Sequence, residues 1–257
     1  MKHKHYTPMA QSKNNKILTV RAMSGLSGDM ILSGLCRIGG FDNDRLNALV
    51  RAILPERAGI LVKVEPRSIN AIAGWGIAID LPPEHAHRSL ADILKIIENS
   101  AMSLAAKDLA AAAFTLLAVA EGKVHGKEAL EVTFHEVGAL DSILDICLAC
   151  ELFWHIAPAS FVCSPLPLAD GGVKCAHGYL PTPAPSVLEM LNDVAVCGFA
   201  GQGETVTPTA ITLLKTFGAK FGPWPEMIIE NQALIFGDKV FPNVPNGAIW
   251  AVGRGCA

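Results

Sequence analysis

The sequence has few aromatic or charged residues and no strong excess of either charge. Aromatic residues occupy 6% of the 257 positions and charged residues 18%, and the formal net charge is −3. Binding to a phosphate backbone by charge needs a basic surface, so nucleic acid is not an expected partner. A disordered chain is also excluded, because 51% of the residues are hydrophobic. The composition predicts a folded protein with a substantial core.

Long apolar runs are missing as well. The longest clean run, Leu109–Ala120, is shorter than the roughly 20 residues that a membrane-spanning helix needs. The polar stretch Met1–Lys16 has no apolar segment of the kind found in secretory signals. We therefore expect no membrane partner and a cytoplasmic location.

The seven cysteines show neither an even number nor a regular spacing, which argues against a disulfide framework and for free thiols. Cys147 and Cys150 form a C-x-x-C pattern, which is typical of redox and zinc sites. Their surroundings, however, resemble a helix interior, and no second C-x-x-C completes a zinc site. We interpret both cysteines as small buried apolar residues.

Hydrophobic periodicity alternates between that of strands and that of helices. Strands are predicted at 17–21, 61–66, 76–81, 132–134 and 161–163, and helices at 30–38, 42–53, 103–123, 141–154, 186–191 and 210–217, with a further helix that Ser89 and Asp92 begin as a capping box. This alternation predicts an α/β fold, a mixed sheet with flanking helices, with α+β as the alternative. The strand order stays open, and the stretch 164–185 is predicted to be a long functional loop.

The chain is expected to divide into three parts. Residues 1–15 form a flexible lead, and residues 16–220 form the α/β domain. Residues 221–257 form a divergent C-terminal extension in which periodicity weakens and Pro and Gly recur.

Two turns that precede helices are candidate anion sites. The first, Ser24–Asp29, follows a strand and contains Gly25 and Gly28, which let a phosphate approach the backbone N–H groups of a helix start. A tight turn with Asp29 as a helix cap is the alternative. Thr207 and Thr209 lie ahead of the second helix, where they would form an anion seat or a simple cap.

Other polar residues are open to more than one interpretation. His85 and His87 lie in a polar loop and could share a metal in an extended chain, or they could be solvated surface residues. Asp141 and Asp145 share one helix face, where two like charges disfavour the helix and indicate a cation or polar partner. Asp141 alone is also explained as an N-cap. Cys175 and His177 are a thiol and an imidazole in the long loop, a pairing that also occurs in nucleophilic catalysis.

Taken together, the motifs resemble those of the LarC family of nickel-pincer cofactor biosynthesis, the nickel insertion proteins or cyclometallases. The resemblance extends from about Ile17 to Phe217. It is carried by Ser24–Met30 (SGLSGDM), His87–Ile93, Ala120–Gly126, Phe134–Ile146 (FHEVGALDSILDI), Ser164–Leu168 with Ala176–Pro185, and Val206–Thr209.

This resemblance implies insertion of nickel into a sulfur-bearing pyridinium mononucleotide, in a CTP-dependent step that also uses a divalent cation. The product contains one nickel–carbon and two nickel–sulfur bonds, so the activity is that of a lyase-type nickel chelatase. The implied nickel ligands are His85, His87, His135, Glu136, Asp141 and His177. Glu136 and Asp29 are the implied catalytic residues, and the implied mononucleotide seat is Ser24, Gly25, Ser27, Gly28, Thr207 and Thr209.

Family members are longer, and CTP binding is assigned to their C-terminal domain. We therefore expect a second LarC-type polypeptide to supply the CTP site. Two alternatives are a non-catalytic nickel-binding or delivery protein and a paralogue that binds another phosphorylated small molecule.

Overall fold

The computed structural model describes residues 15–56, 59–81, 87–134, 138–175 and 178–256. The strands are β1 (Lys16–Ala22), β2 (Leu61–Ile69), β3 (Ile72–Asp80), β4 (Arg88–Ser89), β5 (Thr133–Phe134), β6 (Ser160–Cys163), β7 (Leu166–Asp170), β8 (Gly172–Cys175), β9 (Gly178–Pro181), β10 (Val196–Gln202), β11 (Lys220–Phe221), β12 (Met227–Ile235) and β13 (Ala248–Gly255). The α-helices are α1 (Gly28–Gly39), α2 (Asn43–Ile53), α3 (Leu90–Asn99), α4 (Leu104–His125), α5 (Leu140–Ile156), α6 (Pro185–Met190) and α7 (Pro208–Thr216), and Ala129–Glu131 forms a 3₁₀ turn. The predicted lead, residues 1–15, lies outside the described residues except for its last position.

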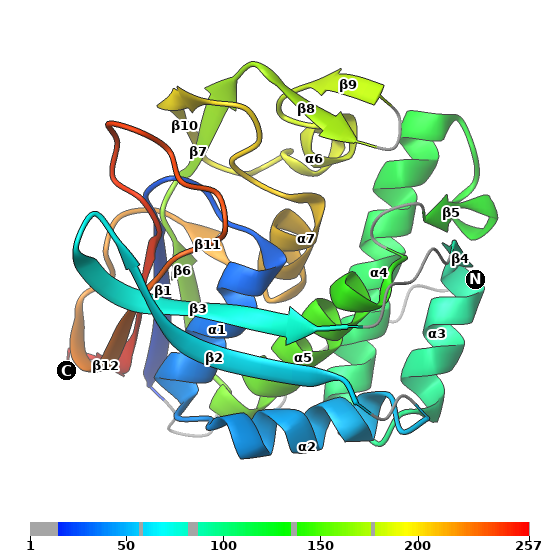
Figure 1. Cartoon of the computed structure of the whole chain (residues 1–257), viewed down its shortest axis with the longest axis horizontal. Coiled ribbons are helices and arrows are strands. Elements are labelled where there is room, and N and C mark those ends of the chain that lie inside the picture. The colour runs from blue at the N-terminus through cyan, green and yellow to red at the C-terminus, as the bar shows by residue number, and fades with distance from the viewer. Residues whose placement is uncertain (1–14, 57–58, 82–86, 135–137, 176–177, 257) are drawn as a thin grey trace.

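A seven-stranded mixed sheet forms one side of the molecule (Figure 1). Its order is β11-β6-β1-β13-β12-β3-β2. β1 pairs with β6 in parallel and with β13 antiparallel, and β12 pairs antiparallel with β13. The predicted α/β fold with a mixed sheet is therefore confirmed.

The strands that periodicity missed are central to this sheet. β13 lies between β1 and β12, although it comes from the region in which the sequence indicated no regular element. The β-bulge between Ile229 and Asn231 interrupts the alternation of β12. A period of two residues is lost at a bulge, which explains the missed strand. Strands before and after residue 220 belong to the same sheet. The boundary between the α/β domain and the C-terminal extension at residue 220 stays a prediction.

Helix α1 packs directly on the sheet, and a glycine allows the close approach. A Cβ on Gly34 would lie only 2.3 Å from Cε2 of Trp250 in β13. The indole ring, which is fully buried, therefore occupies the space that any larger residue at position 34 would need. Gly40 ends the helix in the left-handed conformation at φ 69°, which glycine adopts without a steric penalty.

The remaining helices form layers beyond α1 (Figure 1). α5 packs on α1, α4 on α5, and α3 on α4, while α7 joins α5 and α4. Ser89 and Asp92 form the predicted capping box of α3, and their two reciprocal hydrogen bonds fix its start. Asp42 caps α2 by accepting a hydrogen bond from the Arg45 backbone.

Two local predictions need correction. The stretch 164–185 is not a plain loop, because it contains β7, the β8–β9 hairpin and the start of α6. The prolines and glycines there mark tight connections between short strands. Asp141 is not the N-cap of α5, since the helix begins one residue earlier with Ala139 as N-cap.

The C-x-x-C pattern is structural, as predicted. Cys147 and Cys150 are free, fully buried thiols in α5. Burial raises the pKa of Cys147 to about 12 and the pKa of Cys150 well above its ordinary value. Both therefore stay as neutral, apolar-like side chains.

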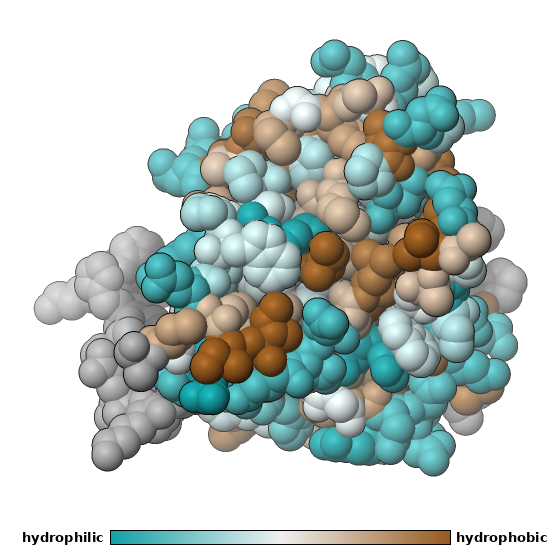
Figure 2. Space-filling view, turned by 90° about the vertical axis from the view of Figure 1, so that its left-hand side faces the viewer, coloured by the Kyte–Doolittle hydropathy of each residue, from teal (hydrophilic) through white to brown (hydrophobic). Residues whose placement is uncertain are grey.

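The surface beside β12 mixes apolar and polar residues. Figure 2 faces this side of the molecule and shows separate apolar patches between hydrophilic ones. Ile228 and Ile229 of β12 are 45% and 44% exposed. In the part of the chain that is described, no helix has the length and apolar character to span a bilayer.

Candidate functional site

The turn between β1 and α1 needs glycine at its second position. Gly25 adopts φ +122°, and a Cβ there would lie 1.9 Å from the carbonyl oxygen of Thr205. Ser27 is the N-cap of α1, and its hydroxyl donates a hydrogen bond to Asp29 instead of capping the helix. The alternative in which Asp29 is the cap is therefore wrong, because Asp29 lies within the first turn.

The second predicted turn lies beside the first. Leu26 and Val206 form a parallel bridge, in which the Leu26 N–H donates to the Thr205 carbonyl at 2.8 Å and the Thr207 N–H donates to the Leu26 carbonyl at 3.2 Å. Thr207 caps α7 by accepting a hydrogen bond from the Ala210 N–H at 3.2 Å. The starts of α1 and α7 are thus held together, so two positive helix-dipole ends face one region.

A cavity of about 210 Å³ opens between these two turns. It is lined by Ser24, Gly25, Leu26, Ser27, Asp29, Met30, Ile69, Glu204, Thr205, Thr207, Phe236, Gly237, Asp238, Lys239, Phe241 and Gly247. Four of the six predicted seat residues, Ser24, Gly25, Ser27 and Thr207, therefore share one cavity. A larger open hollow of about 600 Å³ beside Asn70 and the loop 240–245 has no ionisable side chain in its lining.

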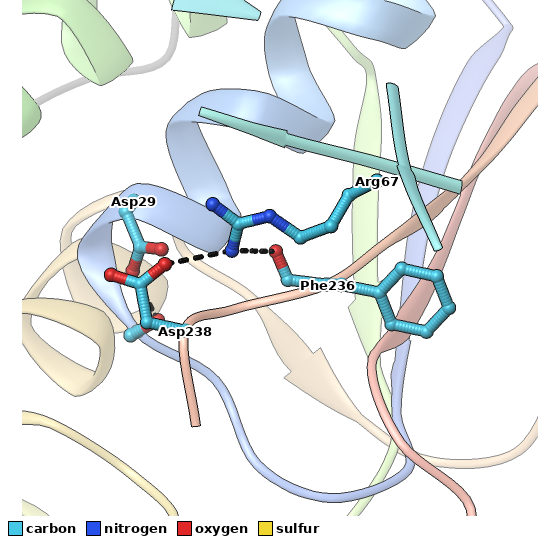
Figure 3. A network of polar contacts seen from close by, with 5 residues as sticks. Asp29, Arg67, Phe236 and Asp238 are labelled. Atoms are coloured by element: carbon cyan, nitrogen blue, oxygen red, sulfur yellow. Dashed lines mark hydrogen bonds and ion pairs between the residues drawn. The ribbon is translucent and has the colours of Figure 1, made fainter. Parts of the chain in front are cut away.

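Acidic groups dominate one wall of the cavity. Arg67 donates to Oδ1 of Asp238 at 2.8 Å and to the Phe236 carbonyl at 3.4 Å, and Figure 3 shows Asp29 beside this pair. Burial raises the pKa of Asp29, the hydrogen bond from Ser27 opposes that rise, and the charge of Asp238 adds to it.

Lys239 is the basic residue in the cavity lining. Its Nζ donates to the carbonyl oxygens of Gln202 and Glu204 at 3.2 and 2.9 Å and lies 4.5 Å from the centre of the Phe241 ring. Burial lowers the pKa of Lys239, and Glu204 opposes that shift. Backbone carbonyls thus hold its ammonium group at the cavity edge.

Behind the first turn, a carboxyl from α5 reaches the start of α1. Oδ2 of Asp145 lies 2.8 Å from the position that a Cβ on Gly28 would occupy, and Cγ2 of Thr209 lies 3.0 Å from the same position. The structure therefore brings Gly28, Thr209 and Asp145 together. Oδ1 of Asp145 is buried and has no hydrogen-bond partner among the described residues.

The sequence profile of the nickel insertion protein family matches residues 18–252. The chain belongs to the nickel insertion protein family. Its match includes both turns of the cavity and reaches into β13, so the family's sequence pattern extends through the sheet's central strands.

Curated relatives of this family agree with the match. Relatives named pyridinium-3,5-bisthiocarboxylic acid mononucleotide nickel insertion protein occur in Desulfitobacterium hafniense, 36% identical over 86% of this chain, and in Staphylococcus epidermidis, 33% identical over 90% of it. The chain spans 55% and 58% of the length of these two relatives. No solved structure matches the chain.

The family-implied nickel ligands are only partly described. His85, His135, Glu136 and His177 lie outside the described residues. His87 and Asp141 are exposed, and Asp141 accepts a hydrogen bond from the Ser142 N–H at 2.7 Å. Within the described ranges, no three histidine, cysteine, aspartate or glutamate side chains come together as a metal site.

Two of the segments that contain implied nickel ligands have described neighbours that lie side by side. β4 pairs with β5 so that Arg88 lies opposite Phe134, and Arg88 donates to the Gly138 carbonyl at 2.7 Å. The residue after His87 and the residues on both sides of 135–137 are therefore neighbours. That the two segments act in one site stays a prediction.

Sequence reasoning missed Arg67, Asp238 and Lys239. Asp238 and Lys239 follow Gly237 directly after β12, in the region of weak periodicity. The only local signal was a glycine followed by charged residues, which marks a turn but not its neighbours. Asp145, in contrast, was indicated by its like charge one helical turn after Asp141.

Proposed function

We propose that this chain takes part in nickel insertion into a sulfur-bearing pyridinium mononucleotide, the step that completes a nickel-pincer cofactor. The observation that carries this proposal is the joining of two family motifs, the Ser24–Asp29 and Thr205–Thr209 turns, in one cavity. The names of the relatives supply the substrate class.

The cavity suits one end of a mononucleotide. Its volume of about 210 Å³ is below the roughly 300–1,000 Å³ of pockets that enclose a whole ligand. We infer that it receives the phosphate and part of the ribose, with the pyridinium ring extending outward. The seat consists of Ser24, Gly25, Ser27, Gly28, Thr207 and Thr209.

The bond-forming step needs a base. A ring C–H bond breaks, its electron pair forms the nickel–carbon bond, and a carboxylate takes the proton. We assign this role to Glu136, with Asp29 as the second carboxylate at the cavity. Nickel is the incoming substrate ion, held by His85, His87, His135, Glu136, Asp141 and His177 until the sulfur atoms of the mononucleotide bind it.

We further propose that a second LarC-type polypeptide supplies the CTP site with its divalent cation. The chain would then be one subunit of a lyase-type cyclometallase. A nickel-delivery protein without catalysis is the second candidate.

A reconstitution experiment tests the proposed function. The purified chain is incubated with NiCl₂, the bisthiocarboxylic acid mononucleotide, CTP and Mg²⁺, with and without the C-terminal half of a full-length relative, and the product is followed by mass spectrometry. Formation of the nickel adduct only with both polypeptides supports the two-part enzyme. Turnover by the chain alone refutes the need for a second polypeptide, and no adduct in either case refutes insertion.

Binding can be tested separately through the cavity lysine. Lys239→Ala should weaken mononucleotide binding about tenfold, since a charge-assisted contact to phosphate is lost. Lys220→Ala, an exposed lysine on β11, is the matched control. Equal affinities of the two variants would place the phosphate elsewhere.

A further inference from the structure

The environment of the Asp145 carboxyl does not fit a purely structural role. Its carboxyl oxygen Oδ1 is buried without a hydrogen-bond partner in the described part of the chain. Buried carboxylates are normally paired or hydrogen-bonded, because an unpaired buried charge is strongly destabilising. Such a group indicates either protonation or a missing ligand.

The charges near Asp145 point to a positive ligand. Among the described residues, the ionisable groups whose charges act on it are Asp29 and Asp141, and both are acidic. Burial, followed by these two like charges, raises the pKa of Asp145 well above its ordinary value. The same charges would favour a cation at this position.

The neighbouring cavity also has acidic residues in its lining. Asp29, Glu204 and Asp238 line it together with Lys239. Arg67 pairs with Asp238 at 2.8 Å, and Lys239 lies beside Glu204, so the carboxylate that a phosphate would meet at the start of α1 is that of Asp29. A positive charge beside Asp29 would offset this repulsion.

We propose that Asp145 and Asp29 bind a hard divalent cation, of the Mg²⁺ or Mn²⁺ class, at the start of α1. Mg²⁺ is commonly held by one or two carboxylates plus substrate phosphate and water, so two protein ligands suffice. Asp29, in the first turn of α1, offsets the positive helix end. The phosphate in this assignment rests on the proposed function, whereas the cation site is testable without it.

Gly28 leaves room for the Asp145 carboxyl. A larger residue at position 28 would press its Cβ against Asp145 and Thr209, at 2.8 and 3.0 Å. The glycine therefore leaves room for the Asp145 carboxyl at the helix start. Asp145 as a whole residue is half-buried, although its Oδ1 is buried.

Mn²⁺ binding to the whole chain, followed by electron paramagnetic resonance, tests the site. Wild-type protein should bind Mn²⁺, and Asp145→Asn should weaken that binding at least about tenfold. Asp108→Asn, the same change at an exposed position of α4, should leave it unchanged. Unaltered Mn²⁺ binding by Asp145→Asn, or none by wild type, overturns the proposal.

A stability measurement separates a ligand role from a folding role. Without metal, Asp145→Asn should melt about 2–4 °C above wild type, because an unpaired buried charge is removed. Saturating Mn²⁺ should raise the melting temperature of wild type but not of the variant. A variant that melts lower than wild type without metal would show that the carboxyl is structural and overturn the proposal.

Nickel and phosphate distinguish the remaining outcomes. Binding of Ni²⁺ but not Mn²⁺ would overturn the hard-cation assignment in favour of a nickel seat. Mn²⁺ should in turn tighten the binding of inorganic phosphate to wild type about tenfold and not to Asp145→Asn. Failure of nickel insertion with intact Asp145-dependent Mn²⁺ binding would refute the proposed function alone.

Discussion

Helix α5 carries two acidic residues with opposite environments. Glu151 is buried and fully partnered, since it accepts hydrogen bonds from the Ser103 N–H at 3.0 Å and the Ser103 hydroxyl at 2.9 Å and lies 3.3 Å from His155. Asp145, less than two turns earlier, has a buried oxygen without a partner. The partnered acid stabilises the start of α4, and the unpartnered one belongs to a site.

Helix α1 shows the same division in its glycines. Gly34 makes room for the Trp250 ring, which is a core contact. Gly28 makes room for the Asp145 carboxyl and the Thr209 side chain at the cavity end. In both helices, the position near the N-terminal end serves the site and the later one serves the core.

Glu151→Ala should cause the largest loss of stability. Ser103 is the N-cap of α4, and its N–H and its hydroxyl both donate to the Glu151 carboxylate. The unfolding free energy should fall by about 3 kcal/mol in urea denaturation followed by circular dichroism. Exposed Glu98→Ala should change it by less than about 0.5 kcal/mol. Similar values for the two variants would break the distinction between the two acids.

Gly34→Ala should cause the second-largest loss of stability. The added methyl group would overlap the Trp250 ring, and overpacking of this kind costs about 1–3 kcal/mol. Gly198→Ala is the matched control, because no atom lies within 4 Å of its Cβ position. An unchanged urea midpoint for Gly34→Ala would show that α1 can move off the sheet.

Asp145→Asn should have a smaller effect of opposite sign. Neutralising the carboxyl should raise the unfolding free energy by about 1 kcal/mol, measured in the presence of EDTA. A loss of stability comparable to that of Glu151→Ala would mean that both acids of α5 serve the core.

Labelling of the cysteine thiols should have the smallest effect on the protein, because only exposed thiols should react. Burial raises the pKa of Cys36, Cys147 and Cys163 to about 12, so at pH 8 these thiols are protonated and shielded. Exposed Cys197 and Cys256 should react with DTNB at once in the folded protein. Rapid labelling of Cys147 would show that α5 opens locally and that its core half is not rigid.

Periodicity predicted most helices and the strands of the first half of the chain. Its failures have local causes. β12 carries a bulge, and the β7–β9 region is built of short strands whose prolines and glycines indicate a loop. The cap of α5 was misplaced by two residues, because Asp141 offers a better capping side chain than Ala139.

Part of the candidate site was also predictable. Each of the two turns has a local signature, glycine before a helix in one and threonine before proline in the other, so both were found separately. The sequence did not predict that Arg67, Asp238 and Lys239 contribute to the site, because these residues are far from the turns in sequence and follow no motif.

The amino-acid sequence alone determined the capping box of α3, the Thr207 cap of α7, the Gly40 stop, the burial of the C-x-x-C thiols and the identity of the two turns, because each depends on residues within one or two helical turns of chain. The tertiary structure alone decided that β13 lies between β1 and β12, that Leu26 meets Val206, and that Asp145 reaches Gly28 without a partner. β1 and β13, Leu26 and Val206, and Asp145 and Gly28 are each more than a hundred positions apart in the sequence, so the pairing of strands and the packing of helices bring them together, and no local pattern does.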